Sequence, residues 1–427
     1  MPTPRTPAKT GGLFAWCLYD WANSPFTTVV ITFVFSAYFA KAVAPDEVTG
    51  TALWGYAMSL SGLAIAVSGP FFGAIADKTG RRKPWLFAFT ALCAVTTVFL
   101  WQIKPEAAYV SLALTLAAVA NYGFESAMVF YNAMLPDIAR REKIGRVSGW
   151  GWGLGYFGGL TALAVCLVGF VQAETPWFGL NKEGAEHLRA TPVLVAVWLA
   201  VFSLPLFFLT PDRERTALPL GAAAKDGIAT LWKTIKGVRA YKDVAWFLVA
   251  RMLYTDGLNT LFAFGGIYAA GTFGFTFTEL ILFGIAINVT SGVGAFAFGW
   301  LDDKIGPKRT VIIALVGLCV LSVSLLLIDS KTLFWAFGLP LGIFVGPAQS
   351  ASRSYMARLA PKELTTEMFG LYAFSGKATA FLGPAVLALA TDLFTSQRAG
   401  MATILGFFVI GGLLLLKVPD VRAGEDS

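Results

Sequence analysis

The chain has 427 residues, of which 56% are hydrophobic and only 14% are charged, and it includes 36 Phe and 13 Trp. A soluble globular domain of this composition could not cover its apolar surface with polar side chains, so the composition excludes that class and indicates that most of the chain faces lipid. The net charge of +7 is not gathered into a basic patch interleaved with aromatic residues, and we therefore expect no nucleic-acid partner.

Long apolar windows recur along the whole chain. A helix needs about 20 apolar residues to cross the hydrocarbon layer of a bilayer. We predict twelve transmembrane helices, at 15–40, 51–76, 84–103, 107–135, 147–171, 191–209, 243–271, 278–301, 310–328, 332–357, 368–391 and 397–416. We expect that the polar start at residues 1–7 is not a signal peptide, because the first apolar run is too long and lacks a cleavage site.

The first predicted helix contains the segment LYDWANSPF at Leu18–Phe26, which places Asp20 and Asn23 at bilayer depth. The seventh predicted helix repeats this aspartate and asparagine 236 residues later, as Asp256 and Asn259. This is one of two internal repeats, and both indicate that the chain is duplicated.

The second repeat is a charged cassette between the second and third predicted helices, which returns 226 residues later between the eighth and ninth. Its members are Gly73, Asp77, Gly80 and Arg81 in the first copy and Gly299, Asp303, Gly306 and Arg309 in the second. A cassette repeated between apolar runs predicts two six-helix halves in the same orientation, the arrangement of secondary transporters whose substrate site lies between the halves.

We expect the first glycine of each cassette to permit close helix approach and the second to turn the chain. The aspartate can meet a helix N-terminus or an arginine across the seam between the halves, and so act as a conformational latch. Pro307 stands where the first copy has Arg81, so we expect an asymmetric latch in which Asp303 matters less than Asp77. The alternative is a basic loop that only orients the chain in the membrane.

The chain divides into a first half at 1–210, a linker at 211–242 and a second half at 243–427. Within the linker, Ile228, Leu231 and Trp232 recur at helical spacing among lysines, which predicts an amphipathic helix lying on anionic headgroups. The N-terminus, the even-numbered loops and the C-terminus carry 24 Lys and Arg, against 6 in the odd-numbered loops. The positive-inside rule therefore places both termini in the cytoplasm.

Five ionisable side chains lie inside predicted helices: Asp20, Glu125, Asp256, Arg353 and Lys377. Each costs at least about 2.5–3.5 kcal/mol at the bilayer centre, so it normally faces a partner or an aqueous cavity. Three acids and two bases suit a zwitterionic substrate, with the amides of Asn23, Asn132 and Asn259 as further candidate ligands.

The alternative to substrate binding is that these charges only pair with one another, as Glu125 with Arg353 and Asp256 with Lys377. Asp20 would then be the acid without a basic partner. It would be the best candidate to exchange a coupling proton, since no histidine lies inside a predicted helix.

The cassette resembles the signature loop of the major facilitator superfamily. The Leu18–Phe26 segment resembles the branch of the autophagy-related vacuolar amino-acid effluxers and their bacterial homologues. This resemblance implies an all-α integral membrane protein with the twelve-helix major facilitator fold, whose helices 1, 4, 7 and 10 line a central cavity. It also implies amino-acid efflux and a place in a bacterial inner membrane.

The leading hypothesis is a secondary active transporter that moves a small polar solute by alternating access. Protons are the candidate coupling ion, and the sequence leaves sodium coupling and uncoupled transport open. A transport-inactive sensor or scaffold on the same fold, or a sugar or drug carrier, are the alternatives. We expect no catalytic site, metal or cofactor, because one histidine in a loop and four isolated cysteines offer no such constellation. We expect a monomer.

Overall fold

The computed structural model describes residues 8–216 and 218–421, and the polar start at residues 1–7 lies outside the described residues. The first part of the described chain consists of α1 (Thr10–Pro25), η1 (Phe26–Phe33), α2 (Phe35–Tyr38), η2 (Phe39–Val43), α3 (Glu47–Thr79), α4 (Lys83–Phe99), η3 (Leu100–Gln102), η4 (Ala107–Tyr109), α5 (Val110–Ile138), η5 (Arg141–Lys143), α6 (Ile144–Cys166), η6 (Leu167–Val171), η7 (Trp177–Gly179) and α7 (Glu186–Leu209).

The remainder consists of α8 (Leu220–Lys236), η8 (Val238–Tyr241), α9 (Lys242–Phe273), α10 (Phe277–Ile305), α11 (Pro307–Leu327), α12 (Lys331–Leu359), η9 (Lys362–Leu364), α13 (Thr365–Lys377), α14 (Leu382–Phe394) and α15 (Gln397–Leu415). The elements η1, η2 and η6 are π-helical and continue α1, α2 and α6.

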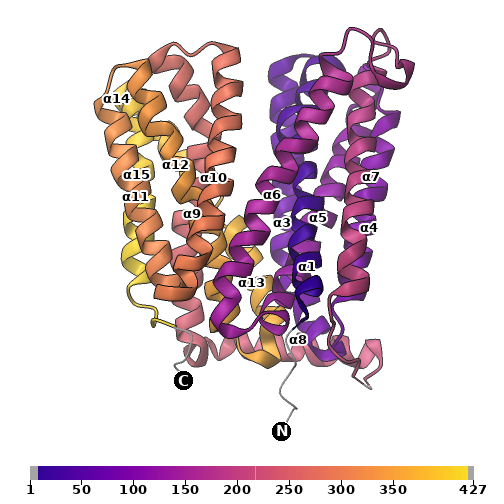
Figure 1. The fold of residues 1–427 in the computed structure, drawn as a ribbon, viewed down its shortest axis with the longest axis vertical. Helices are drawn as coiled ribbons and strands as arrows, with labels where there is room; N and C mark the ends of the chain where they lie inside the picture. Colours follow the sequence, from indigo (N-terminus) through magenta and orange to yellow (C-terminus); the bar gives the residue numbers. More distant parts are fainter. Residues whose placement is uncertain (1–7, 217, 422–427) are drawn as a thin grey trace.

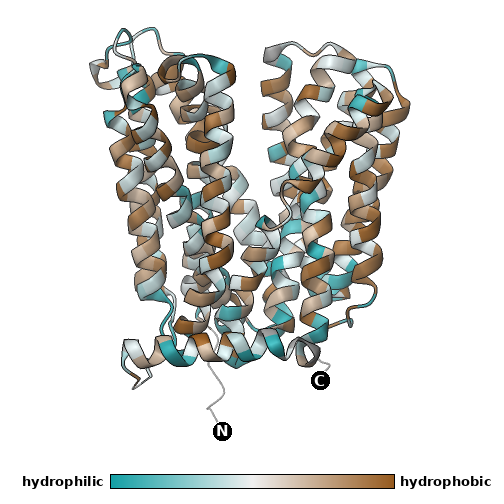
Figure 2. Ribbon diagram, turned by 180° about the vertical axis from the view of Figure 1, so that it is seen from behind, coloured by the Kyte–Doolittle hydropathy of each residue, from teal (hydrophilic) through white to brown (hydrophobic). Residues whose placement is uncertain are grey.

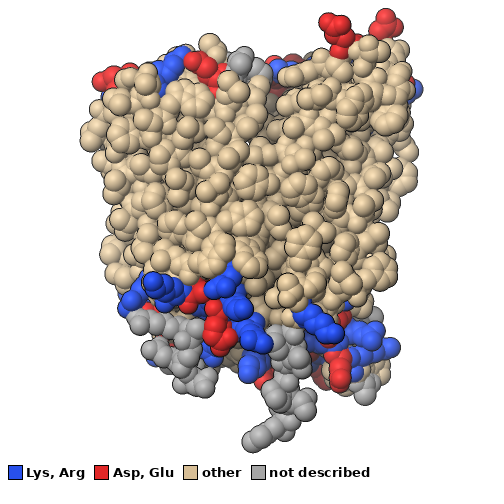
Figure 3. All heavy atoms as spheres, in the orientation of Figure 1, with Lys and Arg blue, Asp and Glu red and all other residues tan. Residues whose placement is uncertain are grey.

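Eleven of the twelve predicted windows coincide with segments that are long and apolar enough to cross a membrane, counted within residues 8–216 and 218–421. The remaining window, 243–271, is the 32-residue helix α9, which Arg251, Asp256 and Asn259 make less apolar. Hydrophobic residues cover the shafts of the helices (Figure 2), and on the face shown in Figure 3 the Lys, Arg, Asp and Glu side chains gather at the two ends of the molecule.

The helices form two bundles that stand side by side (Figure 1). One bundle contains α1–α7, the N-terminal half, and the other contains α9–α15, the C-terminal half. The start of α1, the end of α15 and helix α8 lie at the same end of the molecule, which we call the terminal end, and α8 lies across it (Figures 1 and 2). The other end is called the opposite end below.

Glycines allow the two halves to approach closely where α3 crosses α13 and where α6 crosses α10. A Cβ atom added at Gly73 would overlap the backbone carbonyl of Thr366, and one added at Gly149 would overlap the carbonyl of Ala295. A Cβ at Gly370 would lie 2.5 Å from the carbonyl oxygen of Gly69. The helix backbones therefore touch at these crossings, which leaves no room for a side chain.

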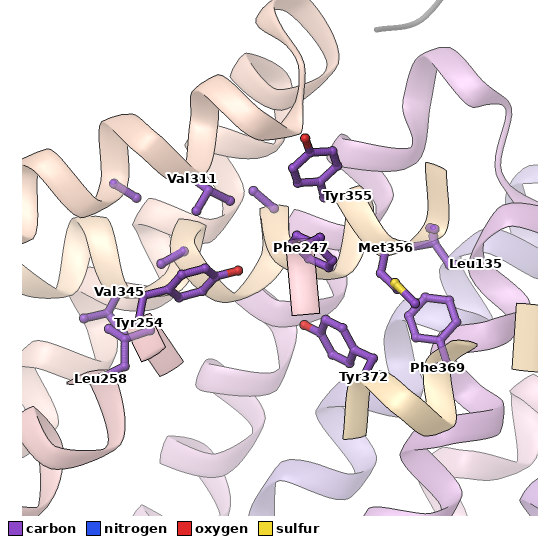
Figure 4. Close-up of a cluster of buried hydrophobic side chains, with 14 of the residues drawn as sticks. Leu135, Phe247, Tyr254, Leu258, Val311, Val345, Tyr355, Met356, Phe369 and Tyr372 are labelled. Carbon is purple, nitrogen blue, oxygen red and sulfur yellow. The ribbon is translucent and has the colours of Figure 1, made fainter. Parts of the chain in front are cut away.

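A cluster of buried aromatic and aliphatic side chains packs the C-terminal half and joins it to the N-terminal half (Figure 4). The rings of Phe247 and Tyr355 lie 4.9 Å apart, and Phe247 is fully buried. Leu135 of α5 belongs to the same cluster as Met356 of α12 and Phe369 of α13. The core is thus continuous between the halves in this conformation, where α12 and α13 pack against α5.

The first and the eleventh predicted spans are among those that are not regular α-helices along their whole length. The first span turns from α1 into the π-helical η1 directly after Pro25, a residue that cannot donate a backbone hydrogen bond. The eleventh predicted span is divided, because α13 ends at Lys377 and α14 starts at Leu382. Residues 378–381 between them form turns. Irregular backbone inside a span is typical of places where protein lines a cavity or a site.

We predict that Gly73→Ala destabilises the protein, because the new methyl group must push α13 away from α3. Forcing one extra carbon into a close-packed crossing costs about 1–3 kcal/mol. Gly55→Ala on the same helix is the matched control, since nothing lies within 4 Å of its Cβ position. That change should stabilise by up to about 1 kcal/mol through helix propensity. Thermal unfolding of the purified protein checks both, and an equal effect of the two changes would contradict the crossing argument.

Candidate functional site

Asp77 lies at the seam between the halves and caps the N-terminus of α13. Its carboxylate accepts the backbone N–H groups of Thr366 and Glu367 at 2.8 and 2.9 Å, and the hydroxyl of Thr366 at 2.7 Å. The side chain is almost fully buried. A carboxylate in this position satisfies orphan donors of the first helical turn and interacts favourably with the helix dipole. Asp77 therefore holds the terminal end of α3 against α13.

Arginines complete this contact, and they differ from the one predicted. Arg82 is 1% exposed, lies 3.7 Å from Asp77, forms an ion pair with Asp137 of α5, and donates to the hydroxyl of Thr366 at 2.8 Å. Arg81, which the sequence suggested, is exposed. Arg82 thus takes the position across the seam that we expected of Arg81.

Arg213 of the linker joins the same group of charges, which sequence reasoning did not identify. It lies 3.4 Å from Asp77 and donates to Asp137 at 2.8 Å. It also donates to the backbone carbonyl of Lys362 at 3.1 Å. Arg213 therefore connects the linker, the N-terminal half and the start of the eleventh span at one point.

The second cassette makes a contact of the same kind with the other pair of helices. Asp303 accepts the backbone N–H of Gly145 in the first turn of α6 at 2.9 Å. Arg146 and Arg358 lie 3.2 and 3.3 Å from its carboxylate, and Arg358 also lies 3.5 Å from Asp302. The α3–α13 and α10–α6 crossings are therefore both closed by an aspartate at a helix N-terminus.

The bases of the second cassette do not face the seam. Lys308 stands at the position equivalent to Arg82, and it donates to the backbone carbonyl of Leu416 at 2.9 Å. Arg309 pairs with Asp420 at 3.3 Å, near the end of the chain. The first contact thus uses Arg82 of its own cassette, whereas the second uses Arg146 and Arg358, which lie outside the cassette.

The two turn glycines of the cassettes adopt the backbone conformation expected of them. Gly80 has φ of +82° and Gly306 has φ of +91°. These values lie in the region that residues with a Cβ rarely adopt. Gly299, like Gly73, lies at a crossing of the halves, where its Cβ position is 3.1 Å from Cα of Arg146.

The intramembrane charges pair differently from the prediction. Arg353 of α12 pairs with Asp20 of α1 at 3.0 Å, not with Glu125. Asp20 also accepts the hydroxyl of Tyr131 at 2.8 Å, and both members of the ion pair are buried. The prediction that Asp20 lacks a basic partner is therefore wrong. Asp20 joins the two halves through an ion pair.

Residues of α5 and α6 accept further hydrogen bonds from the Arg353 guanidinium. It donates through Nε to the hydroxyl of Ser148 at 2.9 Å, through Nη2 to the Ser148 carbonyl at 2.6 Å, and through Nη1 to Asn132 at 3.4 Å. Its guanidinium carbon lies 4.9 Å from the ring centroid of Trp16 and 5.6 Å from that of Trp152. Such aromatic contacts stabilise a desolvated cation.

Lys377 pairs with Glu125 of α5 at 2.7 Å, not with Asp256 as predicted. Unlike the Asp20–Arg353 pair, this pair is partly accessible, with 33% of the lysine side chain and 23% of the glutamate side chain exposed. It also crosses from one half to the other, because Lys377 is the last residue of α13. The pair is therefore an accessible set of opposite charges between the halves.

Asp256 is the acid that lies apart from both cations. Its Oδ2 accepts the backbone N–H of Gly383 in the first turn of α14 at 3.0 Å. Its Oδ1 is buried and has no hydrogen-bond partner among the residues that the structure describes. The residue as a whole is 1% exposed. We predicted a basic partner for Asp256 and none for Asp20, and the structure shows the reverse.

The candidate amides do not form one cluster. Asn132 contacts Arg353, whereas Asn23 is buried and its amide donates to the sulfur of Met128 at 3.3 Å. Asn259 is exposed. Within the described part of the chain, no group of three or more His, Cys, Asp and Glu side chains could hold a metal ion.

A cavity of about 460 Å³ lies toward the opposite end, between η1 of the N-terminal half and helices α9–α12 and α15 of the other half. The threonines Thr27, Thr28 and Thr32 contribute hydroxyls from η1, and Asn288 contributes an amide from α10. The hydroxyl of Ser322 in the lining has no hydrogen-bond partner within the described residues. The remaining lining is mostly apolar and contains no Asp, Glu, Lys or Arg among the residues described.

Comparison with known families gives one match that extends over most of the chain. The model of the family described as "Vacuole effluxer Atg22 like" matches residues 39–145 and 141–427. The MFS-type transporter YxiO of Bacillus subtilis (strain 168) is 28% identical over 416 residues, which cover 97% of this chain and 96% of YxiO. Autophagy-related protein 22 of Coccidioides immitis (strain RS) is 22% identical over 449 residues, covering 87% and 73%.

Solved structures confirm the fold prediction. The proton:xylose symporter XylE superposes with a TM-score of 0.76 at 13% identity, over 96% of each chain. The MFS transporter FucP, crystallised in the outward conformation, superposes with a TM-score of 0.73 at 13% identity, over 96% of this chain and 98% of FucP. The fold is that of the major facilitator superfamily, as the cassettes and the twelve windows predicted.

A double-mutant cycle distinguishes the observed ion pairs from the predicted ones. We predict that Glu125→Gln and Lys377→Gln couple by about 0.5–3 kcal/mol in unfolding free energy, because the two side chains share one hydrogen bond. The matched control combines Glu125→Gln with Arg353→Gln, which should add within about 0.3–0.5 kcal/mol. Coupling in the control cycle, with none in the first, would restore the pairing expected from sequence.

Proposed function

We propose that this chain, which belongs to the vacuole effluxer Atg22-like family and is an MFS-type transporter, moves a small polar solute by alternating access. The observation that carries the proposal is the pair of aspartate contacts at one end of the molecule. Asp77 and Asp303 each cap a helix of the other half near the terminal end, whereas the cavity lies between the halves toward the opposite end. Breaking these contacts and closing the cavity at the opposite end would open the space between the halves at the terminal end.

The basic loops and both chain ends lie on the cytoplasmic side of a bacterial cell membrane in this proposal. Its support is the excess of Lys and Arg in the loops of that end. The conformation described above is then the outward-facing one. Helix α8 supports the same orientation, because Trp232 and Ile228 are exposed on it beside lysines, as on a helix lying at anionic headgroups.

The substrate in this proposal is a zwitterion, with amino acids as the first candidates. The partly exposed pair of Glu125 and Lys377 supports this class, because it offers a carboxylate to an ammonium group and an ammonium to a carboxylate. The name of the family as an effluxer favours export. Protons are the proposed coupling ion, and the description of XylE as a proton:xylose symporter is consistent with such coupling on this fold.

A thermal-shift screen of the purified protein tests the proposed substrate class. A ligand that binds only the folded state at about 100 times its Kd stabilises that state by about 2.7 kcal/mol. We expect stabilisation by one or more amino acids, and none by sugars, nucleosides or polyamines. Counterflow of the binding amino acid in proteoliposomes then tests transport.

The matched variants for this screen are Lys377→Met and Lys331→Met. Lys331 pairs with Glu279 at 2.9 Å outside the seam, so its loss should leave the amino-acid shift unchanged. Loss of Lys377 should abolish that shift. Stabilisation by sugars alone would identify a sugar carrier. Binding without counterflow would instead identify a sensor on the same fold.

We predict that Asp77→Asn opens the terminal end without abolishing substrate binding. The amide cannot accept all three hydrogen bonds that the carboxylate accepts, and an unsatisfied group costs about 1–3 kcal/mol, which changes a two-state ratio about 5- to 150-fold. Spin labels at the exposed positions Arg81 and Glu363 should report a longer distance. Transport should slow, because the conformation that is open at the opposite end becomes less populated.

Asp46→Asn is the matched control, because Asp46 caps the opposite end of the same helix by accepting the N–H of Thr49 at 2.9 Å. It makes the same carboxylate-to-amide change at a helix cap without touching the seam. An equal lengthening of the label distance in both variants would show that this change has the same effect at a cap away from the seam, and would contradict the latch.

A further inference from the structure

Helix α9 holds both pieces of the divided eleventh span. Near the end of α13, Arg251 donates to the backbone carbonyl of Tyr372 and to the hydroxyl of Ser375, each at 2.7 Å. Five residues further along α9, Asp256 accepts the N–H of Gly383 at the start of α14. A cation near a helix C-terminus and an anion at a helix N-terminus are both favourable. Arg251 and Asp256, which carry opposite charges, thus bind the two helices on either side of the break at 378–381.

The approach of α14 to Asp256 is close and depends on glycine. A Cβ atom at Gly383 would overlap the hydroxyl of Thr260 and lie 3.1 Å from Oδ1 of Asp256. That hydroxyl donates to the backbone carbonyl of Asp256 at 2.8 Å, so it is not available to the carboxylate. One carboxylate oxygen is therefore engaged with α14, and the other is buried without a partner among the described residues.

The charged groups on the helices that pack against α9 are engaged elsewhere or lie at helix ends. On α12 and α13, Arg353 pairs with Asp20 and Lys377 with Glu125, while Lys331 pairs with Glu279 of α10. The others are Arg398 on α15, Asp392 on α14, Arg358 on α12, Glu367 on α13, and Asp302, Asp303 and Lys304 on α10. Within the described residues, none of them forms a hydrogen bond or an ion pair with Asp256. A buried carboxylate in such surroundings normally binds a cation or carries a proton.

We propose that Asp256 is the proton-binding site of the carrier, and that its proton loosens the break in the eleventh span. This inference rests on the proposed function and names the group that carries its coupling ion. The proton binds to the free Oδ1 and converts the carboxylate into a neutral acid. The N–H of Gly383 then faces a weaker, uncharged acceptor, so α14 is held less firmly to α9.

The break carries this change to the seam between the halves. Only residues 378–381 separate the first residue of α14 from Lys377, which pairs with Glu125 of the other half. A shift of α14 therefore acts on the accessible ion pair through four residues. Along the same α9–α14 interface lies a pocket of about 590 Å³, and Leu387 in its lining is one helical turn from Gly383.

Infrared spectroscopy of the full-length protein in lipid nanodiscs tests the site without a substrate. Lowering the pH from about 8 to about 6, a range in which exposed carboxylates remain ionised, should produce the carbonyl band of a protonated buried carboxylic acid in the wild type, and Asp256→Asn should remove that band. Asp392→Asn is the matched control, since Asp392 is an exposed acid on α14, and it should retain the band. A band that persists in Asp256→Asn would overturn the proposal. If that variant does not fold, Asp256→Glu must shift the band.

Spin labels at the exposed residues Leu393 of α14 and Leu327 of α11 test the movement. In the wild type their distance should change as the pH is lowered. In Asp256→Asn it should stay at the low-pH value, because the amide imitates the neutral acid. A variant that still follows pH like the wild type would overturn the proposal, as would a distance that responds to sodium at constant pH and not to acid.

The failures of the two proposals are distinguishable. If Asp256 does not bind the proton, the infrared band and the label distance will not depend on it, while amino-acid binding and counterflow remain. If the chain does not carry amino acids, binding and counterflow will be absent, while the pH-dependent band remains.

Discussion

The structure depends on one interaction used three times, a buried aspartate on one helix that caps the N-terminus of another. Asp77 caps α13, Asp303 caps α6 and Asp256 caps α14. Away from water, the first turn of a helix needs acceptors and a carboxylate needs donors, so each group lowers the cost of burying the other. A cap that is supplied by a residue of a different helix can be broken without unfolding either helix. This property makes the same interaction suitable for holding a conformation and for releasing it.

The sequence predicted the fold and the places of Asp77 and Asp303 at the seam, because their signals are local. Span length follows from hydrophobicity, and the cassette spacing identifies Gly73, Asp77 and Gly80 within one loop. Even the partner of Asp77 could be described in advance as a helix N-terminus or an arginine, and the structure shows both. These inferences required knowing which groups need partners, but not where distant helices lie.

The ion pairs could not be predicted in the same way. Which of Asp20, Glu125 and Asp256 meets Arg353 depends on the rotation and depth of four helices from two halves, and pairing by charge alone gave the wrong answer. The prediction named Arg81 instead of Arg82 for the same reason. Neighbouring residues point in different directions at the start of a helix, and only the packing of α3, α5 and α13 decides which one enters the seam.

The contacts of the linker determine how far the halves can separate. Asp212 accepts the N–H of Arg82, Thr216 donates to the carbonyl of Thr79, and Gly227 of α8 packs against α3. These contacts attach the linker to the N-terminal half at several points. Only the five residues from Gly237 to Tyr241 separate α8 from α9, and a chain of five residues reaches less than about 20 Å even when fully extended. In the alternating-access proposal, this short connection limits how far the first helix of the C-terminal half can move from the N-terminal half.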